Sequence, residues 1–232
     1  MLPFLNKNDF LVNCEIHGNN IPGLLNGKCE ACATTEQEKK HNTLYQQEFI
    51  NYQVQVGIPL LFINSTFDNY KPLTTKATEL LDTMRNHDQN SNIVLCGKTA
   101  TGKTHLACAL LNRNFNKSAK YTTFYKLNDL KIRQPEKFEK LLTCKFLVID
   151  ECGISITDAA NHLLFHIINE RYNNMLYTML ISNLSLQKFR QAIGEPVYSR
   201  IKENAIAFDC DWEDYRINHK KLLANNLTNV SK

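Results

Sequence analysis

Gly97-Lys98-Thr99-Ala100-Thr101-Gly102-Lys103-Thr104 is the stretch that decides the fold of this chain. It matches the phosphate-loop pattern G-x-x-x-x-G-K-[ST] at every position. The apolar run 93–96 precedes it, and residues 105–111 follow with helical character. A strand, a glycine loop and a helix in that order form the context in which this pattern binds phosphate.

The residue types in this loop suit a nucleotide. Gly97 and Gly102 let the backbone curl so that its N–H groups point at phosphate oxygens, and the helix N-terminus adds partial positive charge. Lys103 is expected to reach the β- and γ-phosphates of ATP, and the Thr104 hydroxyl to hold Mg²⁺. The alternative is a glycine turn between two core elements. The residues expected to bind the nucleotide are Gly97, Lys98, Thr99, Ala100, Thr101, Gly102, Lys103, Thr104 and His105.

An acidic pair follows a second apolar run. The run 146–149 ends in Asp150-Glu151, which places Asp150 at the carboxyl end of a buried strand. There Asp150 is expected to hold Mg²⁺, directly or through water. Glu151 is expected to act as the general base that polarises the attacking water. The alternative is a surface turn after a strand.

The rest of the pattern alternates strands with helices, which predicts an α/β fold with a parallel sheet flanked by helices and ligands at the carboxyl ends of the strands. We expect further strands at 122–125, 145–149, 178–181 and 205–208. We expect helices from 74 to about 85, at 159–172, 185–192 and 196–203, two short helical pieces within 126–142 separated at Pro135, and a polar helix at the end of the chain.

Composition sets the limits. The 232 residues are 43% hydrophobic and 22% charged, as in a soluble globular protein with one α/β domain and a small appendage. A net charge of +4 permits nucleic-acid binding but does not argue for it. No apolar run approaches the roughly 18 residues of a membrane span, and the first residues do not resemble a signal peptide. We therefore expect a cytoplasmic protein without membrane contact, whose cysteines are thiols or metal ligands.

Four residues near the start have the spacing of a zinc site. Cys14, His17, Cys29 and Cys32 form two short pairs separated by a turn-rich loop. The segment has too little apolar content for a core of its own, so Zn²⁺ would supply its folding energy. The alternative is four unrelated residues in a flexible leader. The expected organisation is a zinc module at 1–34, a linking helix at 35–56 and an ATPase domain at 57–232.

Three polar residues after the acidic pair are further candidates. Asn183 ends a predicted strand and suits a water-orienting amide, although the position is equally consistent with a turn or a helix cap. Arg200 and Arg216 are candidates for an arginine that reaches a γ-phosphate across a subunit boundary.

Taken together, these residues give the chain a family resemblance. It resembles the DnaC-type helicase loaders of the AAA+ class, which are related to the IstB transposition ATPases. The resemblance covers nearly all of residues 14–216. The features that carry it are the cysteine cluster, Gly57-Ile58-Pro59 with Thr66-Phe67-Asp68-Asn69-Tyr70, the phosphate loop, Leu147-Val148-Ile149-Asp150-Glu151-Cys152-Gly153, Asn169-Glu170-Arg171-Tyr172 and Ile181-Ser182-Asn183-Leu184.

The resemblance implies roles that spacing alone did not. It implies an AAA+ P-loop ATPase in which Asn183 is the first sensor, Arg200 a finger acting in trans and Arg216 the second sensor, with Arg171 near the subunit interface. Asp214 stands where relatives often carry Ser. The family's DNA-binding insertion follows the second strand; for it we expect Tyr125, Lys126, Lys131 and Arg133, which suit single-stranded DNA and equally suit a solvated helix face.

The expected function follows from this resemblance. It is ATP-dependent loading of a replicative helicase onto single-stranded DNA, with ATP assembling an oligomer and the zinc module gripping the helicase. One alternative is an ATPase helper that presents target DNA to a transposase. Another is a zinc-dependent adaptor whose ATPase core is only a nucleotide-gated scaffold.

Overall fold

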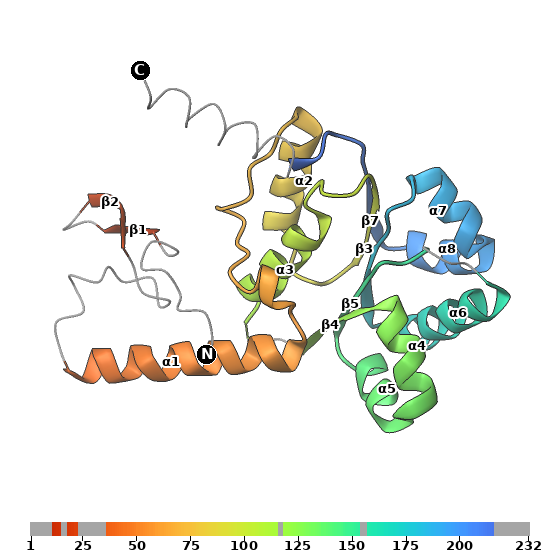
Figure 1. Cartoon of the computed structure of the whole chain (residues 1–232), viewed down its shortest axis with the longest axis horizontal. Coiled ribbons are helices and arrows are strands. Elements are labelled where there is room, and N and C mark those ends of the chain that lie inside the picture. The colour runs from red at the N-terminus through yellow and green to blue at the C-terminus, as the bar shows by residue number, and fades with distance from the viewer. Residues whose placement is uncertain (1–10, 15–17, 23–35, 116–117, 154–156, 216–232) are drawn as a thin grey trace, which may run out of the picture. The chain divides into compact units, whose positions relative to one another are not determined.

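The computed structural model describes residues 11–14, 18–22, 36–115, 118–153 and 157–215, with side chains from residue 43 onward. The chain divides into two compact units, Met1–Gln55 and Val56–Lys232 (Figure 1). In the first, strands β1 (Leu11–Cys14) and β2 (Gly18–Pro22) pair antiparallel. The helix expected at 35–56 is present as α1 (Glu36–Val56). No helix among the described residues is long and apolar enough to cross a bilayer.

The second unit is built on a five-stranded parallel sheet, which confirms the predicted α/β class. Its strands lie side by side in the order β4 (Ala119–Thr123), β5 (Phe146–Asp150), β6 (Tyr177–Ile181), β3 (Asn92–Gly97) and β7 (Ala205–Cys210). Strand β6 thus separates the strand before the phosphate loop from the strand before the acidic pair. Because the strands are parallel, the carboxyl ends of β3, β5 and β6 meet at one edge of the sheet.

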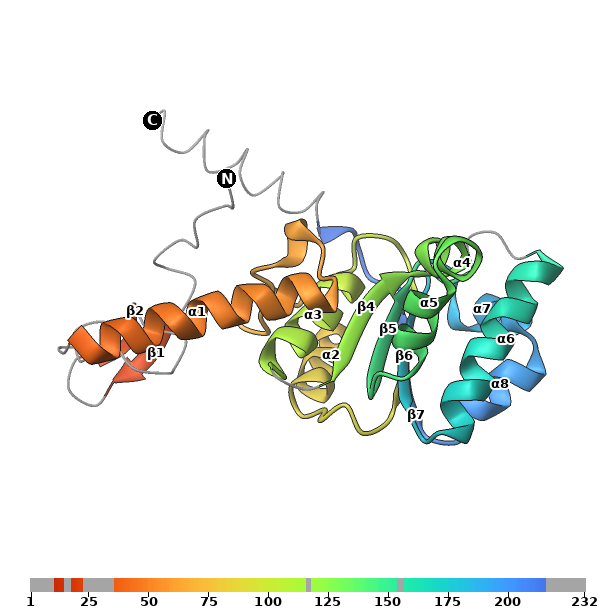
Figure 2. The ribbon, with the colours of Figure 1, turned by 90° about the horizontal axis from the view of Figure 1, so that it is seen from below.

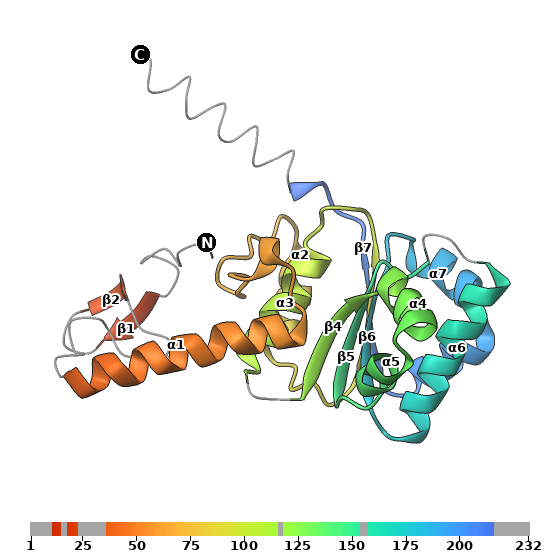
Figure 3. The ribbon, with the colours of Figure 1, turned by 60° about the horizontal axis from the view of Figure 1, so that its bottom comes forward.

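Helices cover both faces of this sheet (Figures 2 and 3). A short 3-10 helix, η2 (Leu60–Phe62), precedes α2 (Thr75–Arg85), and α2 and α3 (Lys103–Arg113) lie on one face. The other face carries α4 (Phe124–Arg133), α5 (Pro135–Leu142), α6 (Asp158–Asn173), α7 (Leu186–Ile193) and α8 (Glu195–Lys202). Burial on both faces explains why β5 is apolar along its length up to Asp150.

The sequence prediction was wrong at the end of the second strand. Strand β4 ends at Thr123, and Phe124 and Tyr125 open helix α4 instead of continuing the strand. The Thr123 hydroxyl accepts a hydrogen bond from the Lys126 N–H, so this residue caps the helix. The expected break at Pro135 is confirmed, because this proline starts α5, where its missing N–H costs nothing. The polar helix expected at the end of the chain lies outside the described residues.

Candidate nucleotide-binding site

The phosphate loop joins β3 to α3 and depends on its two glycines. Gly97 and Gly102 have φ of +113° and +90°, backbone angles that residues other than glycine rarely adopt. A Cβ at Gly97 would lie 2.3 Å from the carbonyl oxygen of Cys210, and one at Gly102 would lie 2.4 Å from the ring of Tyr70. The loop backbone is therefore packed directly against β7 on one side and against Tyr70 on the other.

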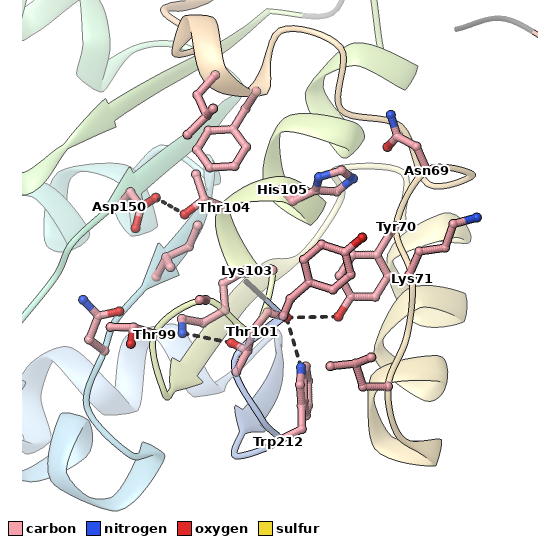
Figure 4. Close-up of a pocket in the computed structure, with 18 of the residues that line it drawn as sticks. Asn69, Tyr70, Lys71, Thr99, Thr101, Lys103, Thr104, His105, Asp150 and Trp212 are labelled. Carbon is pink, nitrogen blue, oxygen red and sulfur yellow. Dashed lines mark hydrogen bonds between the residues drawn. The ribbon is translucent and has the colours of Figure 1, made fainter. Parts of the chain in front are cut away.

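Two aromatic side chains hold the loop in place (Figure 4). The Tyr70 hydroxyl and the Trp212 indole N–H donate to the same carbonyl oxygen, that of Thr101, at 3.1 and 3.0 Å. The N–H of Tyr215 also donates to the carbonyl of Ala100, at 3.0 Å. Sequence reasoning missed Trp212, although the single tryptophan of the chain, placed just after the last strand, was a signal. These contacts hold the loop from both sides.

The loop lysine lies inside the loop. Lys103 is buried, and its ammonium group donates to the carbonyl of Gly97 at 2.8 Å and to the Thr101 hydroxyl at 3.2 Å. It also donates to the carbonyl of Lys98. Burial lowers the pKa of Lys103, while nearby acidic groups including Asp150 oppose that shift. A partly desolvated cation among backbone dipoles suits an anionic ligand such as a phosphate.

A carboxylate and a hydroxyl meet at the start of α3, next to the loop. Thr104, in the first turn of α3, donates its hydroxyl to Asp150 Oδ2 at 2.7 Å (Figure 4). The N–H of Glu151 donates to Asp150 Oδ1 at 2.7 Å. These are hard oxygen donors, as Mg²⁺ prefers, and Mg²⁺ commonly takes only one or two carboxylates besides phosphate oxygens. The chemistry of the pair fits Mg²⁺, and the described part of the chain holds no group of three or more His, Cys, Asp or Glu placed to bind a metal ion by themselves.

A tyrosine lies behind this carboxylate. The Tyr121 hydroxyl, from β4, donates to Asp150 Oδ2 at 2.8 Å. Burial and the adjacent Asp150 raise the pKa of Tyr121, so its hydroxyl stays protonated at any physiological pH. Sequence reasoning did not single out Tyr121, because nothing local to it shows that β4 lies beside β5.

Glu151 and Asn183 reach the same cavity. Glu151 is exposed with φ of +60°, and the following N–H, of Cys152, donates to the carbonyl of Ile181 at 2.8 Å. Asn183 lies two residues after the end of β6 and close to the phosphate loop, since the Gly97 N–H donates to the carbonyl of the next residue, Leu184, at 2.6 Å. The predicted base and the predicted water-orienting amide therefore lie at one edge of the sheet.

The cavity at this edge has a volume of about 430 Å³. Two chemically different sets of residues line it. The polar set is Asn69, Lys71, Thr99, Thr101, Lys103, Thr104, His105, Asp150, Glu151 and Asn183. The apolar and aromatic set is Leu61, Phe62, Tyr70, Leu73, Ile181, Trp212 and Tyr215. A cavity with a charged phosphate loop and an apolar wall suits a nucleotide, which has a polyanionic end and a flat, weakly polar base.

Comparison with known proteins agrees with this geometry. The family model for the IstB-like ATP binding protein matches residues 61–222. The chain belongs to this family.

The relatives of this chain have two kinds of names. The chain is 28% identical over 178 residues to the replicative helicase loader DnaC of Buchnera aphidicola subsp. Acyrthosiphon pisum, which covers 69% of this chain and 72% of that protein. It is 31% identical over 150 residues to the putative ATP-binding protein of insertion sequence IS5376 of Geobacillus stearothermophilus, covering 58% and 59%.

A crystal structure of the DnaC helicase loader shares the fold, with a TM-score of 0.55 and 24% identity over 63% of this chain and 97% of that one. The AAA+ fold expected from the sequence is thus confirmed for the second unit, and the resemblance to the DnaC and IstB group holds.

His105, also expected at the nucleotide, is hydrogen-bonded in this IstB-like chain to the turn at residues 65–66. Its ring Nε2 lies 2.9 Å from the carbonyl of Thr66, and its Nδ1 lies 3.4 Å from the Ser65 hydroxyl. Its ring is 5.7 Å from that of Tyr70. Burial lowers the pKa of His105. The imidazole is therefore neutral at neutral pH and packs the turn against the start of α3.

Arg200 lies away from the cavity of its own chain. Its Nε donates to Asn169 Oδ1 at 3.0 Å, and its Nη1 donates to the carbonyl of Pro196 at 2.7 Å. Its guanidinium also lies 5.1 Å from the centre of the Phe165 ring. These contacts hold the side chain on the surface of α6 and α8, so any contact with a phosphate would have to be with that of another subunit.

Arg171, which the resemblance places near the subunit interface, is buried within its own subunit. It is only 1% exposed, so it does not lie at a surface that another subunit can reach. Its guanidinium donates to the Thr178 hydroxyl and to several backbone carbonyls near the start of β5 and β6. The Arg171 side chain therefore ties α6 to the sheet within its own subunit.

The remaining predicted residues are described only in part. Tyr125, Lys126, Lys131 and Arg133 are all exposed on α4, and Arg133 pairs with Asp129 at 2.6 Å. Arg216 lies outside the described residues, although its neighbour Tyr215 lines the cavity. Of the four expected zinc ligands, His17, Cys29 and Cys32 also lie outside, and only the backbone of Cys14 is described, at the end of β1.

Proposed function

We propose that this chain is a Mg²⁺-dependent ATPase that loads a replicative helicase onto single-stranded DNA. The observation that carries the ATPase part is the 2.7 Å hydrogen bond from Thr104 to Asp150 beneath an intact phosphate loop. Membership of a family of ATP-binding proteins supports the same reading. Helicase loading is supported by the relatives named replicative helicase loader DnaC.

The residues of the cavity would have different roles in ATP hydrolysis. The loop N–H groups and Lys103 would bind the phosphates, and the apolar wall around Leu61 and Tyr215 would hold the base. Asp150 and Thr104 would hold Mg²⁺, which neutralises charge on the phosphates when bound. Glu151 would accept the proton of the attacking water, and Asn183 would orient that water.

A second copy would complete the site. Because Arg200 is fixed on α6 and α8 and does not line its own cavity, we propose that it reaches the γ-phosphate bound by a neighbour. ATP would then lie between subunits and promote self-association. Arg216 would act as second sensor from the segment after Tyr215.

Two further surfaces would engage the partners. The exposed side chains of α4, Tyr125, Lys126, Lys131 and Arg133, would contact single-stranded DNA by stacking and by charge. The segment 1–34 would fold around Zn²⁺ held by Cys14, His17, Cys29 and Cys32, and would grip the helicase.

Native mass spectrometry tests the whole proposal. The protein is mixed with the replicative helicase of the organism that encodes it, with and without ATP. We expect a complex that retains one zinc per loader chain and responds to ATP, and we expect a Lys103→Ala variant to lose the ATP response. A zinc-bound, folded protein that forms no complex in either condition would refute helicase loading.

The 31% identity to an insertion-sequence ATP-binding protein favours a second candidate, an ATPase helper of a DNA transposase. Binding of duplex DNA in the presence of ATP, without binding of helicase, would select this candidate over the first.

A further inference from the structure

We propose, on the basis of the ATPase function proposed above, that Tyr121 is a positioning residue for the Mg²⁺-binding carboxylate of Asp150. Tyr121 does not line the nucleotide cavity, and neither the phosphate loop nor the acidic pair includes it. It would act only through Asp150, by fixing the direction in which that carboxylate faces.

The sheet brings the two residues together. Strand β4 pairs with β5 so that Thr123 lies opposite Asp150 and Tyr121 lies opposite Val148. Side chains two residues apart on a strand share a face. The Tyr121 side chain therefore has to reach only two residues further along β5 than its own partner Val148 to meet Asp150. Its hydroxyl oxygen lies 2.8 Å from Asp150 Oδ2.

The hydrogen bonds of Asp150 show what Tyr121 adds. Oδ2 accepts from Thr104 and from Tyr121, and Oδ1 accepts from the backbone N–H of Glu151. The terminal torsion of an aspartate is intrinsically broad, so donors on both oxygens are what fix the plane of this carboxylate. An ionised carboxylate has about four acceptor sites, which leaves room for a cation beside the three donors.

Thr104 is fixed by the same arrangement. Because its hydroxyl proton points at Oδ2, the lone pairs of Thr104 Oγ1 face away from Asp150 and remain available to a cation. If Asp150 turned, this hydroxyl would lose its acceptor and its orientation. Tyr121 therefore stabilises the direction of two oxygen donors from a position outside the cavity.

A buried tyrosine commonly finds a hydrogen-bond acceptor for structural reasons alone, so the experiment must separate positioning from stability. A fluorescent ATP analogue is titrated with Mg²⁺ at equilibrium, for the wild type and for Tyr121→Phe. In excess EDTA we expect equal binding to both, because the phosphate loop is intact. We expect the Mg²⁺ concentration at half-effect to rise about tenfold in the variant, as for other residues that orient metal ligands.

Thr178→Val is the matched control. Thr178 is a buried hydroxyl of the same sheet, it accepts from Arg171 Nε at 2.8 Å, and it is in β6 rather than next to Asp150. We expect this variant to lose thermal stability while keeping the wild-type Mg²⁺ midpoint. A Tyr121→Phe midpoint equal to that of Thr178→Val and the wild type would overturn the positioning role and leave the ATPase proposal standing. A wild type whose nucleotide binding ignores Mg²⁺ would overturn both.

A second measurement does not depend on the folding of a variant. 3-Fluorotyrosine placed at position 121 alone reports on its hydroxyl environment by ¹⁹F NMR. At constant ATP we expect its resonance to shift as Mg²⁺ is added. The Mg²⁺ concentration at half of that shift should equal the one at half-effect in the nucleotide-binding titration. A resonance that stays fixed while nucleotide binding responds would also overturn the role of Tyr121.

Discussion

Tyr70 and Trp212, which lie before the first and after the last strand of the parallel sheet, donate hydrogen bonds to one and the same carbonyl oxygen, that of Thr101 in the phosphate loop. The loop therefore owes its conformation to two segments outside the motif as well as to its own glycines. One of these segments precedes the first strand of the sheet and the other follows the last. Folding of both is needed before the loop is complete.

Trp212→Phe should weaken nucleotide binding, because the substitution keeps a ring but removes the indole N–H. A hydrogen bond of this kind contributes about 1 kcal/mol, so we expect the dissociation constant to rise about fivefold. A fluorescent-nucleotide titration measures it. Tyr172→Phe removes a hydroxyl bonded to Glu203, away from the loop, and serves as the control. Wild-type affinity in Trp212→Phe would show that the indole contact does not support the loop.

Gly102→Ala should abolish nucleotide binding. The added Cβ would meet the Tyr70 ring at 2.4 Å, at a backbone φ of +90°, so the loop or the ring must shift. Gly194→Ala is the matched control, because φ there is +76° but the nearest atom to the new Cβ, Pro196 Cδ, is at an unstrained 3.7 Å. We expect Gly194→Ala to lose about 1–3 kcal/mol of unfolding free energy, because its φ of +76° and ψ of 160° lie in a region that other residues rarely adopt, and to bind nucleotide normally. Equal binding by both alanine variants would contradict this account of the loop.

Arg200→Ala should retain ATP binding and lose hydrolysis by a factor of about 10³ or more, as for other arginines that act in trans. Mixing it with Lys103→Ala should restore part of the turnover, since a mixed pair contains one intact loop facing one intact arginine. Arg190→Ala is the control, because Arg190 pairs with the exposed Glu195 and stacks on Tyr198 on the surface. If the mixture stays inactive while Arg190→Ala turns over normally, Arg200 does not act across subunits.

His105 should make stability depend on pH. Burial lowers its pKa in the folded state, so the unfolded chain binds the extra proton first as the pH falls. The contribution of neutral His105 to the unfolding free energy is therefore complete above the unfolded pKa of about 6.5 and is lost progressively below it. Urea unfolding between about pH 5.5 and 8 should show this loss in the wild type. In His105→Gln the unfolding free energy should change less with pH over that range. An identical slope of unfolding free energy against pH in the variant and the wild type would rule out His105 as the source.

The sequence predicted the parts of the site that are local in the chain. The phosphate loop needs eight consecutive residues, and Asp150 follows its own apolar strand, so motif and pattern were sufficient for both. The alternation of strands and helices was likewise sufficient for a parallel sheet. The second strand was misplaced: it spans Ala119–Thr123 instead of 122–125, because a side-chain cap at Thr123 outweighed the strand character of the residues after it. The last strand also extends to Cys210 rather than 208.

The contacts made by Tyr121, Trp212 and Arg171 could not be predicted in this way. Each depends on which strands are neighbours, and the order β4-β5-β6-β3-β7 is not visible in any local pattern. Arg171 shows the point most clearly. The carbonyls at the start of two strands supply enough acceptors to bury its guanidinium.

The hydrogen bond from the Gly97 N–H to the carbonyl of Leu184 connects the turn after β6 to two parts of the molecule. On one side it supports the first residue of the phosphate loop. On the other it runs straight into α7 and then α8, which carries Arg200. The first residue of the phosphate loop is thus hydrogen-bonded to the same continuous stretch of backbone, residues 184–202, whose last helix bears this arginine.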